Sequence, residues 1–362
     1  MALALVRTAA AEVDRPAAVD FEAFEQELVD QFALAYAAGG CTDGHIAGCR
    51  RAVVEFARFL GRPVWCASPD DADRFLAVCR QTWGNESSTV AGKGYALSQF
   101  YEFLIDRYQQ KIQALTGFVV IQPIDEYNRP RRAQNPAARV PPSDAEVEAL
   151  FNAWGPSIVD ARKYLPAARD YFAASLWRRA GLRINETVML DNRDWRPDLG
   201  SFGKLHVRHG KGSNRLGPKA RMVPAINGVA ELMAWWTEVR PLYGRGWDDP
   251  DGPMLPSERY DRRDRGVRAR CGDDGLRSGL ASAVARFLPA WDDGRLTPHT
   301  LRHYCASSLY GAGMDLVALQ ELLGHHWVAT TTRYVHTRRD HVERSWTRAN
   351  ERVAARLVGK DE

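Results

Sequence analysis

Residues 297–303 read TPHTLRH, and they predict a helix whose first turns are suited to an anion. Thr297 is a good N-cap residue, and Pro298 suits the first helical position. His299 and Arg302 are three residues apart, so they share one face of that helix. The face lies in the first turns, where backbone N–H groups favour negative charge. A cation and an imidazole there suit a phosphate, although an ordinary surface arginine beside a capping histidine has the same spacing.

A short helix with a defined end follows this stretch. Residues 315–323 carry leucines at positions 316, 319, 322 and 323, which predicts a helix with these side chains inward. Gly324 fits its C-terminal cap. His325 therefore falls in the turn directly after the helix, and Tyr334 follows nine residues later.

Upstream, an alternating pattern predicts a β-hairpin. Leu205 and Val207 alternate with polar neighbours, and residues 221–224 resume an extended pattern after a long tip rich in glycine. A solvated surface is the plain interpretation of the cations in this stretch, which no acidic residue interrupts. These cations are Lys204, Arg208, Lys211, Arg215, Lys219 and Arg221.

Together, these motifs resemble the signature of the tyrosine recombinase (phage integrase) family. Their order and the spacing from histidine to tyrosine match that family. The motifs are GLRINE (residues 181–186), GKG (210–212), RMVP (221–224), HTLRH (299–303), LGH (323–325) and Tyr334. The resemblance covers residues 145–340 in detail, and the N-terminal helices match only in kind.

The resemblance implies a covalent mechanism. Tyr334 would attack the scissile phosphate and form a 3′-phosphotyrosyl link, leaving a free 5′-hydroxyl. Arg183 and Arg302 would hold the phosphate with their planar guanidinium groups. His299 would move the proton of the tyrosine, and His325 would hydrogen-bond a non-bridging oxygen. The bond energy stays in the covalent link, so we expect no cofactor.

A lysine and a glutamate complete the implied site. Lys211 would protonate the 5′-oxygen, and glycine flanks it on both sides. Lys219 competes for this role because the hairpin tip is longer than the usual loop of the family. Glu186 lies about one helical turn after Arg183 and would orient the site.

Other chemistry on these residues is less well supported. Tyr304 and Tyr310 are rival nucleophiles, although Tyr304 precedes Cys305 in a helix that reads as buried. His299 and His303 have i, i+4 spacing, but the glutamate of a zinc H-E-x-x-H motif is missing, so we expect no metal. A type IB topoisomerase or telomere resolvase, and a DNA-binding homologue without catalysis, are the alternative functions.

The chain divides into a helical N-terminal part and a mixed C-terminal part. Apolar periodicity predicts helices from about 21 to 34, with Phe21 and Leu34 among the inward positions, from 43 to 60, after Pro69, and from 88 to 108. A linker rich in proline and arginine ends at a capping box formed by Ser143 and Glu146. We expect a mainly α fold with a small antiparallel sheet (α+β). The expected parts are a flexible tail (1–18), a helical core-binding, SAM-like domain (19–122), a linker (123–142), a catalytic domain (143–340) and a C-terminal helix (341–362).

The composition is compatible with a nucleic-acid partner. The 362 residues carry a net charge of +4, and the sequence pI is about 8.7. A second arginine-dense stretch covers residues 259–270. We find no apolar run long enough to span a membrane. The six cysteines form no C-x-x-C pair, so we expect a reducing, cytoplasmic setting of bacterial or phage type, at the nucleoid.

The expected partners are a specific double-stranded DNA site and other copies of the chain. Residues 340–357 suggest a helix with Val342, Trp346 and Val353 on one stripe. By the resemblance, this helix docks on a neighbouring protomer in a tetramer on two DNA sites, and the free protein is a monomer or weak dimer. Packing on its own domain is the alternative. Candidate DNA contacts are Arg50, Arg51, Arg58, Lys93, Arg131, Arg132, Arg215 and Lys219.

Overall fold

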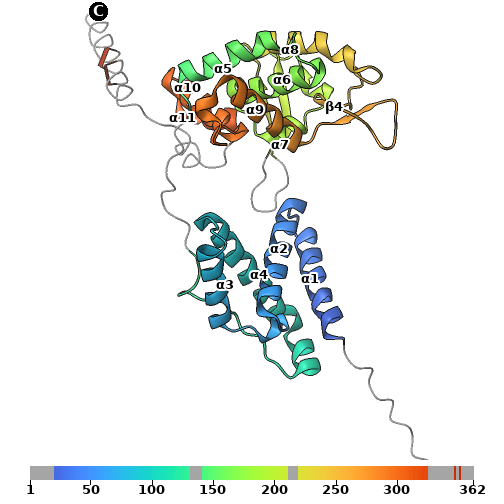
Figure 1. Cartoon of the computed structure of the whole chain (residues 1–362), viewed down its shortest axis with the longest axis vertical. Helices are drawn as coiled ribbons and strands as arrows, with labels where there is room; N and C mark the ends of the chain where they lie inside the picture. Colours follow the sequence, from blue (N-terminus) through green and yellow to red (C-terminus); the bar gives the residue numbers. More distant parts are fainter. Residues whose placement is uncertain (1–19, 131–140, 211–218, 325–345, 348–349, 352–362) are drawn as a thin grey trace, which may run out of the picture. The chain divides into compact units, whose positions relative to one another are not determined.

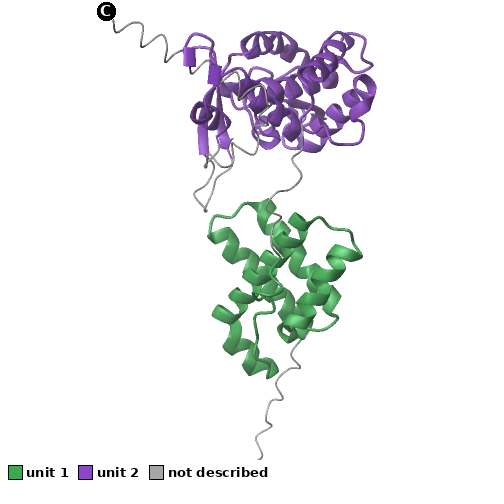
Figure 2. Cartoon of the chain, turned by 90° about the vertical axis from the view of Figure 1, so that its left-hand side faces the viewer, with its two compact units in different colours: residues 1–136 green, residues 137–362 purple. Residues whose placement is uncertain are grey.

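The computed structural model describes residues 20–130, 141–210, 219–324, 346–347 and 350–351. Contacts divide the chain into two compact units, residues 1–136 and 137–362 (Figure 2). Each unit has its own hydrophobic core, as separate domains do. None of the described helices combines the length and the apolar character needed to cross a membrane.

The first unit is built from helices (Figure 1). They are α1 (Phe21–Ala38), α2 (Asp43–Leu60), the 3-10 turn η1 (Val64–Cys66), α3 (Pro69–Gln81) and α4 (Ser87–Thr116). Helix α2 has the expected bounds, and α4 continues two turns further than predicted. Phe21 and Leu34 were wrongly predicted to lie inward, since they are 44% and 62% exposed. The buried stripe of α1 is set by Phe24, Leu28 and Phe32. Leu34, two positions after Phe32, therefore points to the opposite side of the helix. Phe21 lies on the side of the stripe, with its ring centroid 5.9 Å from that of Trp65, but it is the first residue of the helix and stays partly exposed.

The second unit combines helices with two small antiparallel sheets. The predicted α+β fold is confirmed, but the sequence analysis predicted one sheet and not the second. Its first half comprises α5 (Asp144–Ser157), α6 (Tyr164–Ala180), α7 (Ile184–Val188), η2 (Asn192–Asp194), β1 (Trp195–Arg196), β2 (Lys204–Gly210) and β3 (Lys219–Pro224). Its second half comprises α8 (Val229–Val239), η3 (Arg240–Tyr243), β4 (Pro256–Tyr260), β5 (Arg268–Arg270), α9 (Asp273–Phe287), η4 (Pro289–Trp291), α10 (Pro298–Gly311) and α11 (Leu316–Leu323).

Helix α6 lies at the centre of this unit, in contact with α8, α9 and α10. Phe172 and Trp177 on α6 are completely buried. Phe172 stacks on Trp236 of α8 with ring centroids 4.6 Å apart, and Trp177 donates its indole N–H to Thr187 of α7 at 3.0 Å. The aromatic core therefore fixes α7, which carries part of the site, against α6.

Local sequence signals position the elements around the site. The predicted hairpin is confirmed, with β2 and β3 antiparallel and Val207 opposite Arg221. The capping box of Ser143 and Glu146 begins α5 as predicted. Gly324 ends α11 in the left-handed conformation, as expected for its cap.

Candidate functional site

Helix α10 begins as the sequence predicts. The Thr297 hydroxyl accepts a hydrogen bond from the backbone N–H three residues on, at 3.2 Å, and Pro298 occupies the first position. Arg302 is completely buried and donates to the carbonyls of Gly181 and Leu323, the second at 2.7 Å. These carbonyls lie at the C-terminal ends of α6 and α11. Arg302 therefore joins three helices, and the interpretation as an ordinary surface arginine is excluded.

Arg183 and Glu186 are fixed by the start of helix α7. The carboxylate of Glu186 accepts hydrogen bonds from the backbone N–H of Arg183 at 2.8 Å and from its Nη1 at 2.6 Å. Nη2 of Arg183 also donates to the carbonyl of Gly324 at 3.5 Å. The side chain of Arg183 is 22% exposed, whereas that of Glu186 is 1% exposed. The buried carboxylate thus orients a guanidinium group that remains accessible.

A third arginine binds the same carboxylate. Arg221 on β3 donates to both oxygens of Glu186, at 2.9 and 2.8 Å, and its Nε donates to the Leu322 carbonyl at 2.9 Å. Nη1 of Arg302 lies 3.8 Å from Glu186 Oε2. Three guanidinium groups from the start of α7, from β3 and from α10 therefore surround one buried carboxylate. We call Arg183, Glu186, Arg221 and Arg302 the arginine–glutamate cluster.

The cluster keeps Glu186 ionised. Burial alone would raise the pKa of this carboxyl, but the hydrogen bonds and charge of Arg221 and the charges of Arg183 and Arg302 lower its pKa to about 2. At neutral pH the cluster holds three positive charges and one negative charge. Its surplus of positive charge favours an anionic ligand.

The turn after α11 requires a glycine. Gly324 has a φ of +63°, a conformation that other residues rarely adopt. A Cβ atom at this position would lie 2.9 Å from Cδ and 3.0 Å from Nη1 of Arg221. The absence of a side chain therefore lets the chain pass directly against the cluster, just before His325 in the sequence.

The structure brings together Arg183, Glu186 and Arg302 among the residues predicted from the sequence. His299 is exposed on α10, and its ring lies 4.7 Å from that of His303 in an edge-to-face arrangement. Lys219 is exposed at the start of β3, opposite Gly210. Three predicted catalytic residues lie outside the described residues: Lys211, His325 and Tyr334.

Arg221 is the residue that the sequence analysis missed, because it was counted as part of a basic run and of the strand motif RMVP but not as a site residue. Strand alternation could have found it, since Arg221 and Val223 lie two residues apart and both are buried, whereas Met222 between them is exposed. An arginine on the buried face of a strand needs an internal carboxylate.

A second ion cluster supports the hairpin. Arg208 on β2 donates to Asp194 at 2.6 Å and to Asp191. Asp191 also accepts from Arg270, whose Nη1 donates to the carbonyl of Val188 at 2.7 Å. Two cations of the basic hairpin stretch, Arg208 and Arg221, therefore form internal ion pairs. The interpretation of the stretch as a solvated surface does not hold for these two residues.

The rival tyrosines lie on α10. Tyr304 is partly buried against the core of the second unit, and burial together with the charge of Asp144 raises its pKa to about 12. A phenol with a raised pKa is harder to ionise, which does not favour Tyr304 as a nucleophile. Tyr310 is also partly buried against that core.

The candidate DNA contacts of the first unit differ in their surroundings. Arg50, Arg51 and Arg58 are exposed on α2, and Arg50 forms an ion pair with Asp30 at 2.6 Å. Lys93 is 14% exposed and pairs with Glu55 at 2.7 Å. Its ammonium also lies 4.8 Å from the centroid of the Trp83 ring. This position favours an internal role for Lys93 over the DNA contact expected from the sequence.

Other predicted contacts are only partly covered by the structure. Trp346 is 69% exposed. The remaining ones lie outside the described residues: Arg131, Arg132, Arg215, Val342 and Val353. Within the described ranges, no group of three or more histidine, cysteine or acidic side chains is arranged to hold a metal ion.

The chain has a helical unit and a second unit that carries the arginine–glutamate cluster. In the sequence, the cluster is followed by a turn and then by a tyrosine. This combination is typical of site-specific tyrosine recombinases. These enzymes transfer DNA strands. The Phage integrase family model matches residues 154–341, which is more than half of the 362 residues. The chain belongs to the phage integrase family.

Curated relatives agree with this assignment. The chain is 28% identical over 304 residues to tyrosine recombinase XerC of Vibrio vulnificus (strain YJ016), covering 83% of this chain and 82% of the relative. It is 26% identical over 294 residues to tyrosine recombinase XerC of Haemophilus influenzae (strain 86-028NP), covering 80% and 84%.

Solved structures share the fold. The Tn1549 transposon integrase in complex with transposon right end DNA aligns with a TM-score of 0.63 at 18% identity, covering 89% of this chain and 99% of that chain. XerH site-specific recombinase bound to a palindromic difH substrate aligns with a TM-score of 0.62 at 19% identity, covering 89% and 84%.

Proposed function

We propose that the chain cleaves and rejoins a specific double-stranded DNA site through a 3′-phosphotyrosyl bond at Tyr334. The observation that carries this proposal is the arginine–glutamate cluster, where Arg183 and Arg302 meet around the buried carboxylate of Glu186. The cluster contacts Gly324, from which the sequence continues to His325 and Tyr334.

The proposed reaction exchanges one phosphoester for another. The Tyr334 oxygen attacks phosphorus, the bond to the 5′-oxygen breaks, and the liberated 5′-hydroxyl of a partner strand later reverses the step. Arg183 and Arg302 neutralise the non-bridging oxygens, and each contributes roughly 3 kcal/mol by analogy with loss of one oxyanion-hole donor. Because Arg302 is completely buried, direct contact with DNA requires one of its carbonyl partners to give way.

Proton transfer is assigned to lysine and histidine. Lys211 protonates the 5′-oxygen, with Lys219 as the competing residue, exposed at the start of β3. His299, exposed in the first turn of α10, receives the proton of Tyr334. His325 donates a hydrogen bond to a non-bridging oxygen.

The proposed assembly is a tetramer on two DNA sites, with exchange passing through a Holliday junction. The helical domain at residues 19–122 and the catalytic domain at 143–340 bind opposite faces of the DNA, joined by the linker at 123–142. The C-terminal helix at 341–362 docks on a neighbouring protomer. The 69% exposure of Trp346 supports this role, because a large aromatic side chain is a natural interface anchor.

The six cysteines are free thiols, which suits the cytoplasmic location that we propose. The structural neighbours include integrases bound to DNA, such as the lambda integrase (75–356) dimer on a COC′ core site, which supports DNA as the partner of this chain.

A covalent-capture experiment tests the nucleophile. The target site is first recovered by sequencing DNA fragments footprinted by the protein, and a duplex of that site is then nicked next to the scissile phosphate, so that religation is prevented. Active protein should accumulate as a covalent adduct. Tyr334→Phe should bind the same duplex but form no adduct, whereas Tyr304→Phe and Tyr310→Phe should retain it. An adduct that survives in Tyr334→Phe and maps to another tyrosine would contradict the assignment.

The same substrate separates the rival enzyme class. A type IB topoisomerase relaxes supercoiled DNA without a specific site, whereas a recombinase forms joined products only from two copies of its site. Relaxation of plasmids that lack the footprinted site, without joint products, would favour the topoisomerase.

A further inference from the structure

The hairpin of β4 and β5, residues 256–270, carries six arginines and three acidic residues. Figure 1 shows this hairpin extending beyond the helices of its unit, and we call it the arginine arm. We propose that its exposed arginines bind the phosphate backbone of double-stranded DNA outside the catalytic site. The inference rests on the proposed function, because it assumes that the chain acts on DNA.

Two of the six arginines hold the arm in place. Arg268 donates to the carbonyls of Glu258 at 2.5 Å and Tyr243 at 3.4 Å, and its guanidinium lies 4.2 Å from the Tyr260 ring centroid. Arg270 donates to Asp191 and to backbone carbonyls at the end of α7, as described above. The base of the arm is thus fixed to the catalytic unit, so the tip is presented in a preorganised position.

The other four arginines are exposed and clustered near the tip. They are Arg259, Arg262, Arg263 and Arg265. Within the part of the chain that the structure describes, none of these four forms an ion pair with an acidic residue. Like charges this close together repel one another, so an unpaired group favours an external anion.

The acidic residues of the arm are engaged elsewhere. Glu258 pairs with Lys163 at 2.7 Å. Asp261 accepts the backbone N–H of Arg263 at 2.7 Å, and Asp264 accepts the backbone N–H of Gly266 at 2.8 Å. These carboxylates shape the turn of the hairpin rather than neutralise the guanidinium groups of the exposed arginines.

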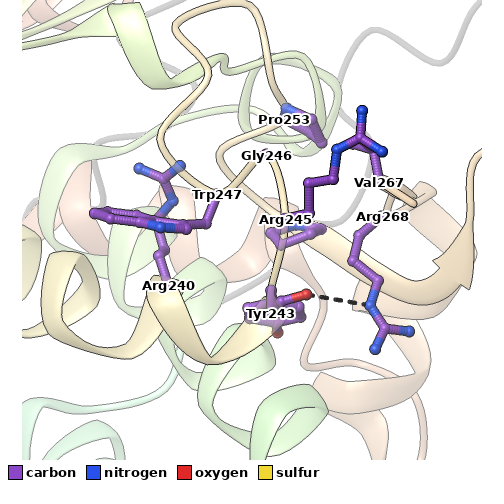
Figure 3. Close-up of a pocket in the computed structure, with 9 residues that line it drawn as sticks. Arg240, Tyr243, Arg245, Gly246, Trp247, Pro253, Val267 and Arg268 are labelled. Carbon is purple, nitrogen blue, oxygen red and sulfur yellow. Dashed lines mark hydrogen bonds between the residues drawn. The ribbon is translucent and has the colours of Figure 1, made fainter. Parts of the chain in front are cut away.

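The base of the arm does not form a site for a small anion. Figure 3 shows the pocket there, lined by Arg240, Arg245 and Arg268, whose guanidinium groups point in different directions. The enclosed space is about 10 Å³, which is room for about one water molecule. So small a pocket has no room for a free phosphate, and two of its arginines are already engaged, Arg268 with backbone carbonyls and Arg245 with Asp264 at 3.4 Å.

Arginine is well matched to that ligand. Its planar guanidinium can donate two parallel hydrogen bonds to a phosphate. Contacts to the DNA backbone position a protein without reading sequence, so the arm should act on any duplex. Each phosphate that it neutralises also releases counterions, which makes its contribution dependent on salt.

The test compares two double variants of the full chain on a 30-base-pair duplex of arbitrary sequence. Arg262→Gln with Arg263→Gln removes two charges from the arm. Arg162→Gln with Arg286→Gln removes two exposed charges of the same unit outside the arm. If each of these two arginines neutralises one phosphate, the plot of log affinity against log salt concentration should become shallower by about 1.8, since each phosphate contributes about 0.9 to the slope. The loss of affinity between 50 and 200 mM salt should then be roughly tenfold smaller than for wild type.

The outcomes separate the two proposals. A slope reduced in the arm variant and unchanged in the control supports the arm, provided that the arm variant still forms the covalent adduct on the nicked site duplex at low salt. Equal slopes in wild type and the arm variant would overturn the inference. They would mean that these arginines contact water or a protein partner instead of DNA. Failure of the wild type to bind this arbitrary duplex at 50 mM salt would also overturn the inference, whereas failure to form the covalent adduct on the nicked site duplex would contradict the proposed function itself.

Discussion

Replacing Glu186 with glutamine removes the one negative charge that holds three guanidinium groups. The pKa of Glu186 is lowered from its ordinary value of 4.5 to about 2, which corresponds to roughly 3 kcal/mol of stability at 1.36 kcal/mol per pKa unit. Removing one partner of a buried ion pair costs about 3–5 kcal/mol, which agrees in size. We therefore expect the free energy of unfolding of Glu186→Gln to fall by about 3 kcal/mol at pH 7.

The effect should depend on pH in a defined direction. A folded pKa below the ordinary value means that the carboxylate stabilises the protein fully above about pH 4.5, and that this stabilisation is lost as the pH falls through about 2. The difference between wild type and Glu186→Gln should therefore be complete at pH 7 and narrow between about pH 5 and pH 2.

Urea unfolding followed by tryptophan fluorescence measures this difference. Trp177 and Trp236 are completely buried in the second unit, so their emission reports its unfolding. Asp198→Asn is a matched control, because it also converts an arginine-paired carboxylate to an amide, but at an exposed position 2.7 Å from Arg196. The control midpoint should stay near that of wild type. If Glu186→Gln unfolds at the same midpoint as the control, the reasoning about the cluster is refuted.

Three further predictions use other features of the site. Gly324→Ala should destabilise the second unit by roughly 1–3 kcal/mol in the same assay, because its φ is +63° and the added methyl group would meet Arg221. Burial raises the pKa of the Cys305 thiol to about 12, so this cysteine should resist thiol reagents at pH 8 in the native protein and react after unfolding. Of Lys211→Met and Lys219→Met, only the variant that loses the general acid should fail to cleave, and we expect this to be Lys211→Met. A substrate with sulfur in place of the 5′-bridging oxygen should restore cleavage by that variant, because a thiolate leaves without a proton.

The parts of the fold that sequence predicts well depend on neighbouring residues. Thr297 caps α10 through a backbone group three residues away, and Gly324 ends α11 through its own backbone conformation. Such signals need no knowledge of the rest of the fold. The order of the site motifs was likewise readable, and Arg183, Glu186 and Arg302 do meet in space.

The parts that sequence does not predict depend on contacts between distant segments. Arg221 binds Glu186, which is 35 residues earlier, and the Leu322 carbonyl, which is 101 residues later. Lys93 was predicted to be a surface cation, but it pairs with Glu55 and packs against the ring of Trp83. In each case the charge was visible in the sequence, whereas its partner was fixed only by the packing of separate elements.

The charge balance of the arginine–glutamate cluster offers a physical reason why three arginines share a single glutamate. Glu186 remains ionised because its pKa is about 2, so the three arginines and one glutamate leave two positive charges uncompensated. A phosphodiester carries one negative charge, but the five-coordinate phosphorus formed by attack of a tyrosine oxygen carries about two. Groups that are fixed before the reaction stabilise the state whose charge they match best. If the proposed reaction takes place at the cluster, its surplus of positive charge matches the transition state better than the substrate. Glu186 would then contribute by fixing the positions of the cations while cancelling only one of their charges.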